Sequence, residues 1–77
     1  MSIVIDVHGL YVDEALKKIK TAIISNYSAN LIEVIHGYNK GFAIKNALKE
    51  EGKHLSKRVS QVIEKPSNGG ITLIYLK

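Results

Sequence analysis

The sequence predicts an α/β fold, more narrowly an α+β two-layer sandwich with two helices on one face of a four-stranded mixed sheet. Three observations predict it. Two strand–loop–helix units follow one another, and residues 66–70 (Pro-Ser-Asn-Gly-Gly) make a strong turn between two later strands. The length of 77 residues suits a single domain over residues 1–77. A chain this short buries only about two-thirds of its unfolded surface, so two layers are the realistic limit.

The first unit begins with a strand at residues 3–8, where apolar side chains alternate with others in a period of two. A helix is expected over residues 12–27, because apolar side chains recur every three or four positions and form one buried stripe. The stripe consists of Val12, Ala15, Leu16, Ile19, Ala22, Ile23 and Tyr27. Residues 26–30 then make a turn, and residues 31–36 form the second strand.

The second unit continues with a loop at residues 37–41, which is rich in residue types that tolerate positive φ. A helix is expected over residues 42–51, with Gly52 as its C-terminal cap. Its inward side chains are predicted to be Ala43, Ile44, Ala47 and Leu48. Residues 58–64 and 71–76 are the last two strands, so the element order is βαβαββ.

The connections fix much of the topology. Two strands joined through a helix are expected to be parallel, with a right-handed crossover. The turn at residues 66–70 makes the last two strands an antiparallel hairpin. With only two helices, both are expected on one face of the sheet, which leaves the other face partly open.

The composition excludes several classes of protein. There is no cysteine, which excludes a disulfide scaffold and a zinc finger. No apolar run approaches the roughly 20 residues of a membrane span. The chain enters a strand at once and shows no basic region of a signal peptide. We therefore expect a cytoplasmic protein with no membrane partner.

The charge is moderately basic. Eleven Lys and Arg against seven Asp and Glu give a formal net charge of +4, which suits a polyanionic partner such as nucleic acid. Six of the eleven positive charges fall within residues 40–58; they are Lys40, Lys45, Lys49, Lys53, Lys57 and Arg58.

Both early strands end in His-Gly, at His8-Gly9 and His36-Gly37. Parallel strands bring these ends to one edge of the sheet, where open α/β sheets place ligand sites. Asp6 and His8 are two residues apart on a strand and so share a face. The carboxylate could orient the imidazole for acid–base catalysis, or the pair could hold a divalent metal ion such as Mg²⁺ or Mn²⁺. Alternatively, Asp6 only caps a turn, and His8 only forms a hydrogen bond with a backbone carbonyl at the end of the strand.

The loop at residues 37–41 leads into a helix N-terminus, where free N–H groups attract anions. Lys40 adds a charge there, and Asn39 is one of the residues that allow the turn. Lys45, Lys49 and Lys53 line one side of the helix and could follow phosphates, or could simply be a solvated face. Tyr38 could stack on an unpaired base, or could pin its own loop to the sheet.

The positions of the other aromatic residues predict roles in packing. Tyr11 and Tyr75 are expected at the edge of the core, and Phe42 is expected to pack on Leu48 or on the sheet.

Three segments together resemble the Smr (small MutS-related) domain family. Residues 5–16 (Ile-Asp-Val-His-Gly-Leu-Tyr-Val-Asp-Glu-Ala-Leu) resemble its opening signature, leucine-aspartate-leucine-histidine-glycine. Residues 36–48, beginning His-Gly-Tyr-Asn-Lys-Gly, resemble its second signature, histidine-glycine-x-glycine. Residues 69–76 resemble its glycine-led closing strand. The resemblance spans nearly the whole chain, with the segments in the family's order.

The resemblance implies a βαβαββ sandwich similar to the C-terminal domain of translation initiation factor three, with the last strand inside the sheet. It implies binding to DNA or RNA, and endonuclease activity as in several members, including some that cut messages on stalled ribosomes. By position it assigns catalysis to Asp6 and His8. It assigns the nucleic-acid site to His36 and Gly37, and His36 is expected to take part in catalysis by binding and polarising the phosphate. The predicted nucleic-acid-binding set is Gly9, Gly37, Tyr38, Asn39, Lys40, Gly41, Lys45 and Lys49.

The sequence also departs from the family pattern. Asn39 stands where many members have the second glycine of the loop, Tyr11 replaces a threonine cap, and Lys45 replaces a common arginine. Lysine is a point charge without the two-pronged phosphate grip of arginine. The leading hypothesis is an endonuclease that cleaves phosphodiester bonds. The alternative is a non-catalytic adaptor on DNA, RNA or the ribosome, and the open sheet face leaves a monomer or a weak homodimer possible.

Overall fold

The structure is a computed structural model that describes residues 1–38 and 41–77. Its element order confirms the predicted βαβαββ arrangement, with ends shifted by one or two residues. The elements are β1 (Ser2–Asp6), α1 (Val12–Ser25), β2 (Leu31–Ile35), α2 (Gly41–Glu51), a 3₁₀ turn (Gly52–His54), β3 (Val59–Glu64) and β4 (Ile71–Leu76).

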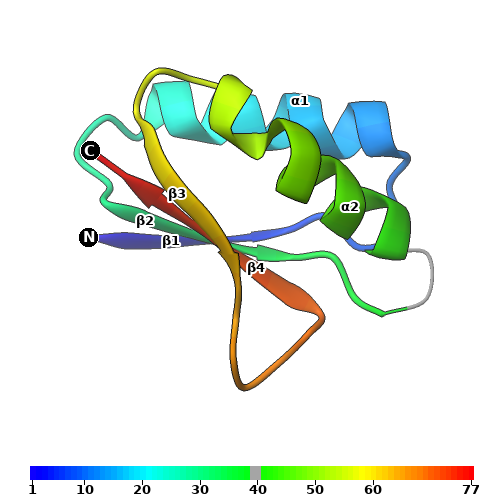
Figure 1. The fold of residues 1–77 in the computed structure, drawn as a ribbon. Helices are drawn as coiled ribbons and strands as arrows, with labels where there is room; N and C mark the ends of the chain where they lie inside the picture. The colour runs from blue at the N-terminus through cyan, green and yellow to red at the C-terminus, as the bar shows by residue number, and fades with distance from the viewer. Residues whose placement is uncertain (39–40) are drawn as a thin grey trace.

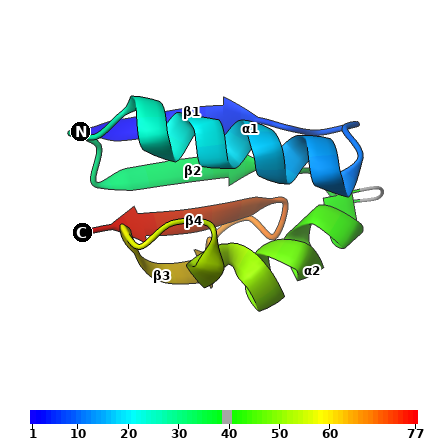
Figure 2. The same ribbon diagram turned by 90° about the horizontal axis from the view of Figure 1, so that it is seen from above.

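The four strands form one mixed sheet in the order β1-β2-β4-β3. β1 and β2 are parallel, while β4 is antiparallel to both of its neighbours, β2 and β3. Figure 1 shows both helices on the same side of the sheet, and Figure 2 shows α1 above β1 and β2. The two-layer prediction is therefore confirmed, as is the position of the last strand inside the sheet.

The core lies between this sheet and the two helices. Alternate residues of the central strands point inward, so β2 contributes Ile32 and Val34 while β4 contributes Ile74. Full burial of such a side chain stabilises the fold by about 1.5–3 kcal/mol. The helices supply the other side of the core through Ala15, Ile19, Ile23, Ile44 and Leu48.

Several predicted core positions are wrong. α1 ends at Ser25 because the Asn26 side-chain amide donates to the Ala22 carbonyl at 2.8 Å. Tyr27 therefore lies beyond the helix and is 83% exposed. Ala43 is also exposed, because α2 meets the core through the narrow stripe of Ile44 and Leu48.

The predicted packing of Phe42 and Tyr11 is also wrong, since they are 60% and 80% exposed. Gly52 does not end α2 in a left-handed cap but opens the 3₁₀ turn. It is buried against β3, where an added Cβ would lie 2.9 Å from Val62 Cγ2. Glycine is therefore favoured at position 52 because it allows the chain to pack closely against Val62.

Arg58 fastens the start of β3 to the end of α1. Its guanidinium donates to the carbonyl oxygens of Ile23 (2.7 Å), Asn26 (3.3 Å), Tyr27 (2.7 Å) and Ala29 (2.9 Å). These include carbonyls at a helix C-terminus, which favours positive charge. Arg58 is one of the six positive charges of residues 40–58, but its guanidinium binds backbone carbonyls within the fold.

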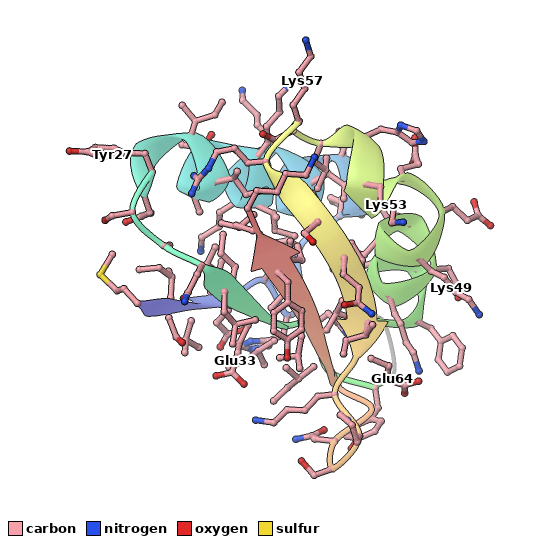
Figure 3. The ribbon with its side chains drawn as sticks, turned by 60° about the vertical axis from the view of Figure 1, so that its left-hand side comes forward. Tyr27, Glu33, Lys49, Lys53, Lys57 and Glu64 are labelled. Atoms are coloured by element: carbon pink, nitrogen blue, oxygen red, sulfur yellow. The ribbon has the colours of Figure 1, made fainter. Side chains whose placement is uncertain are left out.

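The face of the sheet opposite the helices carries both apolar and charged side chains. Glu33 accepts a 2.8 Å hydrogen bond from the Lys65 ammonium there. Figure 3 shows Glu33 pointing away from the helices. Around this ion pair the strands present Leu31, Ile35, Ile63, Ile71, Leu73 and Tyr75.

None of the helices formed by residues 1–38 and 41–77 is both long and apolar enough to cross a lipid bilayer.

Candidate nucleic-acid interface

The two His-Gly corners lie side by side at one edge of the sheet. The parallel pairing of β1 and β2 continues past the strands, since the Val7 N–H donates to the Ile35 carbonyl at 2.9 Å. Gly9 and Gly37 then turn the chain with the same φ of +80°, a conformation that strains residues with a Cβ. A Cβ built on Gly37 would lie 3.9 Å from the His8 Cβ. We call residues 8–9 and 36–37 the His-Gly edge.

Asp6 and His8 form a close pair on the open face of this edge. The Asp6 Oδ1 atom accepts hydrogen bonds from His8 Nδ1 at 2.5 Å and from the His8 backbone N–H at 3.0 Å. A carboxylate only accepts, so it selects the tautomer with the proton on Nδ1. The Nε2 atom then carries a free lone pair. Because the His8 side chain is 71% exposed, Nε2 is available to a substrate.

The same contacts stabilise the ionised form of the Asp6 carboxyl group. The hydrogen bond from the His8 ring is the largest cause that lowers the pKa of Asp6 below its usual value of 3.8, followed by the His8 backbone N–H. The charges of His8 and Lys18 act in the same direction. Asp6 therefore stays ionised at neutral and mildly acidic pH and continues to orient the ring.

This lowered pKa predicts a change in acid stability. A folded pKa below the unfolded value adds stability above about pH 4, and that stability is lost as the pH falls through the folded pKa. The Tm of Asp6→Asn is therefore expected to lie below that of the native protein at pH 7, with the gap closing as the pH falls below about 4. Thermal melts over this pH series test it, with Glu50→Gln as a surface control. A gap that stays constant at low pH would contradict it.

His36 does not face the same side as His8. Its ring is 1% exposed, with Nδ1 donating to the Gly37 carbonyl at 2.9 Å and Nε2 accepting from the Thr72 hydroxyl at 2.8 Å. The alternation of β2 puts His36 on the inner face with Ile32 and Val34. The two strand ends do meet at one edge, as expected, but the expectation that His36 binds and polarises a phosphate directly is wrong, because its ring is buried. His36 instead connects the His-Gly edge to β4.

This arrangement predicts that Thr72→Val leaves a buried ring nitrogen without a partner. Such a loss costs about 1–3 kcal/mol. We expect chemical denaturation to show a decrease of this size, while Thr21→Val, on the exposed side of α1, changes stability by less than about 0.5 kcal/mol. Equal stability of the two variants would show that the Thr72–His36 bond contributes nothing.

Tyr38 pins its loop to the turn between β3 and β4. Its hydroxyl donates to Asn68 Oδ1 at 2.8 Å, and its ring lies beside Gly69 and Gly70. The Gly70 carbonyl accepts from the backbone N–H groups of His36 and Gly37, both at 3.0 Å. The N–H of Gly37 is thus already bonded, and the pinning alternative is the one that the contacts support. The Tyr38 side chain is nevertheless 63% exposed.

The lysines of α2 differ in their surroundings. Lys45 donates to Glu64 Oε1 at 2.7 Å and lies 5.4 Å from the centre of the Phe42 ring. The Lys45 ammonium lowers the pKa of Glu64, mainly through this hydrogen bond. Figure 3 shows Lys49 and Lys53 pointing outward from α2 and the turn after it. A hollow of about 300 Å³ separates α2 from β3, and its lining includes Phe42, Lys45, Asn46, Lys49, Glu64 and Thr72.

Comparison with known proteins agrees with this geometry. The family model of the Smr domain matches residues 5–77. The chain belongs to the Smr domain family. Its structure is similar to the crystal structure of the Smr domain of Thermus thermophilus MutS2, with a TM-score of 0.80 and 28% sequence identity. That similarity covers 97% of this chain and 98% of the other. No curated protein matches the sequence.

The remaining predicted residues of this Smr domain have simpler positions. Gly9 is exposed, with no atom within 4 Å of where a Cβ would be, so its conformation alone requires glycine. Gly41 begins α2. Asn39 and Lys40 lie outside the described residues.

The absence of a threonine cap in this Smr domain is partly offset. The Glu14 carboxylate accepts a 3.2 Å hydrogen bond from the Tyr11 backbone N–H at the start of α1. This is the reciprocal half of a capping box.

The described residues of the Smr domain do not form a metal cage. Within residues 1–38 and 41–77, no group of three or more His, Asp or Glu side chains is placed to hold a metal ion. The Asp6 Oδ1 atom is already bonded twice to His8. The acid–base alternative fits the Asp6–His8 geometry. A Mg²⁺ or Mn²⁺ ion at Asp6 stays a prediction, because Mg²⁺ usually needs only one or two carboxylates together with substrate phosphates and water.

Proposed function

We propose that this Smr domain is an endonuclease that binds DNA or RNA at the His-Gly edge and cleaves a phosphodiester bond with His8 as the acid–base group. The family is known for nucleic-acid binding, and the net charge of +4 suits a polyanion. The observation that carries the proposal is the exposed Asp6–His8 pair with its outward Nε2 atom.

The chemistry follows from the tautomer that Asp6 selects. In this proposal His8 Nε2 accepts the proton of the attacking oxygen, which is a water or a ribose hydroxyl. The oxygen forms a bond to phosphorus as the bond to the leaving oxygen breaks. The imidazolium, stabilised by the Asp6 carboxylate, then gives the proton to the leaving oxygen. His36 would act as a positioning residue by holding the carbonyl of Gly37 and β4.

The test is a cleavage screen with purified protein. Supercoiled plasmid and structured RNA are incubated with Mg²⁺, with Mn²⁺ or with a chelator, beside an Asp6→Asn/His8→Ala double variant that controls for contaminating nuclease. The expected result is nicking or cutting by the native protein alone. Equal cutting by both proteins would assign the activity to a contaminant and overturn the proposal.

A non-catalytic adaptor is the second candidate, favoured because the described part of the edge offers a single outward imidazole. It predicts salt-sensitive binding to nucleic acid or to ribosomes that persists in the double variant and weakens in Lys45→Glu/Lys49→Glu. Binding of this kind without cleavage under any metal condition would favour the adaptor.

A further inference from the structure

Three of the five aromatic residues of the chain are exposed around the His-Gly edge. Tyr11 is 80% exposed, Tyr38 is 63% exposed and Phe42 is 60% exposed. Rings left this open contribute little burial to the fold, so the core does not account for them. Their position is what they share, because each follows one of the two His-Gly corners within five residues.

Two hollows and the contacts around Gly69 connect these rings to the His-Gly edge at Gly9. Tyr11 lines a hollow of about 390 Å³ with Gly9 and with Ala43 of the first turn of α2. Phe42, the neighbour of Ala43, lines the second hollow, between α2 and β3. The two hollows are therefore lined by consecutive residues of α2, Ala43 beside Gly9 and Phe42 beside the lysines.

The Tyr38 ring completes the connection. A Cβ on Gly69 would lie 3.6 Å from Tyr38 Cε1 and 4.0 Å from Lys45 Nζ, so the ring and the ammonium flank the same glycine. Lys45 in turn lies over Phe42. We name Tyr11, Tyr38, Phe42, Lys45 and Lys49 the aromatic strip.

Exposed rings that alternate with lysines are the features that bind unpaired nucleotides. Each base can stack on an aromatic side chain, while the lysines attract the phosphates. A double helix hides the faces of its bases in its own stack, so these rings would add little to duplex binding. Lys45 is paired with Glu64, which leaves Lys49 as the more available cation of the strip.

We propose that the aromatic strip binds unpaired nucleotides, so that the substrate of this Smr domain is a single strand or an unpaired segment of DNA or RNA. The inference rests on the proposed function and deepens it by naming the substrate class. The strip would deliver the flexible backbone to His8 Nε2, which an intact duplex does less readily.

The test measures binding by fluorescence anisotropy at one fixed salt concentration. The probes are labelled oligothymidylate and oligouridylate of about 16 nucleotides, together with a duplex of the same length. We expect the single strands to bind at least about tenfold more tightly than the duplex. Comparison of the two single strands distinguishes DNA from RNA.

Substitutions of single aromatic residues measure how much each ring contributes to single-strand binding. Tyr11→Ala and Phe42→Ala are each expected to weaken single-strand binding by about fivefold or more, since stacking contributes about 1–3 kcal/mol per base. Duplex binding should change by less than about twofold. Tyr11→Phe should bind like the native protein. Tyr27→Ala is the matched control, because Tyr27 is 83% exposed and Figure 3 shows it at the opposite end of the molecule from Lys49. Exposed positions make loss of folding a minor concern, and thermal melts check it.

The outcomes separate this inference from the proposed function. Duplex bound as tightly as single strands, or native single-strand affinity in both alanine variants, would overturn the inference. Cleavage of a single strand by those variants at the native rate would overturn it while leaving the His8 chemistry intact. Ring-dependent binding of single strands without any cleavage would support it and count against the endonuclease. Failure to bind any of the probes would overturn both.

Discussion

His8→Ala is expected to lower the rate of phosphodiester cleavage by about 10²- to 10⁴-fold, the contribution of a positioned acid–base group. The variant loses the only ring nitrogen that the described His-Gly edge presents to solvent. It keeps the backbone, the lysines and the exposed aromatic rings, so its affinity for nucleic acid should stay within about threefold of native. Single-turnover cleavage at saturating protein measures the rate directly.

Two further variants make this prediction specific. Asp6→Asn leaves His8 in place but removes the carboxylate that fixes its tautomer, so cleavage should fall by about tenfold or more. His54→Ala is the matched control, since His54 is exposed in the 3₁₀ turn after α2. Native rates in both His8→Ala and Asp6→Asn would remove this pair from the mechanism.

Arg58→Ala is expected to have the largest effect on stability, about 2–4 kcal/mol. Four carbonyl oxygens lose a charged donor, and hydrogen bonds to charged groups contribute about 1.5–3 kcal/mol each before the exposed ones find water. For a domain of this size each kcal/mol lowers the Tm by about 4–8 °C. Calorimetry should therefore show a decrease of about 10–30 °C.

Controls distinguish the shape of the guanidinium from its charge. Arg58→Lys keeps the charge but cannot direct donors at four carbonyls, so its stability should lie between those of the native protein and the alanine variant. Lys57→Ala, at the exposed neighbouring position, should change stability by less than about 0.5 kcal/mol. An Arg58→Ala variant as stable as Lys57→Ala would contradict the role given to this clamp.

The periodic parts of the fold were predictable because burial repeats along the chain. Alternation in β1 and the three-and-four spacing in α1 place Ile5, Val7, Ala15 and Ile19 in the core, as observed. The hairpin turn predicts that β3 and β4 pair, but it does not say which of them adjoins β2. That choice came from the family resemblance, because either strand satisfies the local pattern.

The candidate site was predictable only in part. Asp6 and His8 were expected on one face, and they are bonded there. The same alternation also places His36 with the inward residues Ile32 and Val34, so its burial could have been predicted from β2. The repeated His-Gly pair indicates only that the two strand ends are adjacent, and it does not say which face each ring occupies.

Other features depend on contacts between distant parts of the chain. Lys45 bonds to Glu64 across 19 positions, and Arg58 bonds to carbonyls 29 to 35 positions away. Tyr11 and Phe42 are exposed at the starts of α1 and α2, which depends on how the helices pack against distant segments. No local pattern encodes these distances.

The central place of β4 constrains how the domain can be made. A nascent chain stopped at residue 70 would contain β1, β2 and β3 but nothing to bridge β2 and β3, because β4 supplies the ladder to each of them. Thr72, which holds His36, would also be missing. Sheet closure must therefore wait until residues 71–76 have left the exit tunnel, and premature termination would yield a protease-sensitive fragment without a closed sheet.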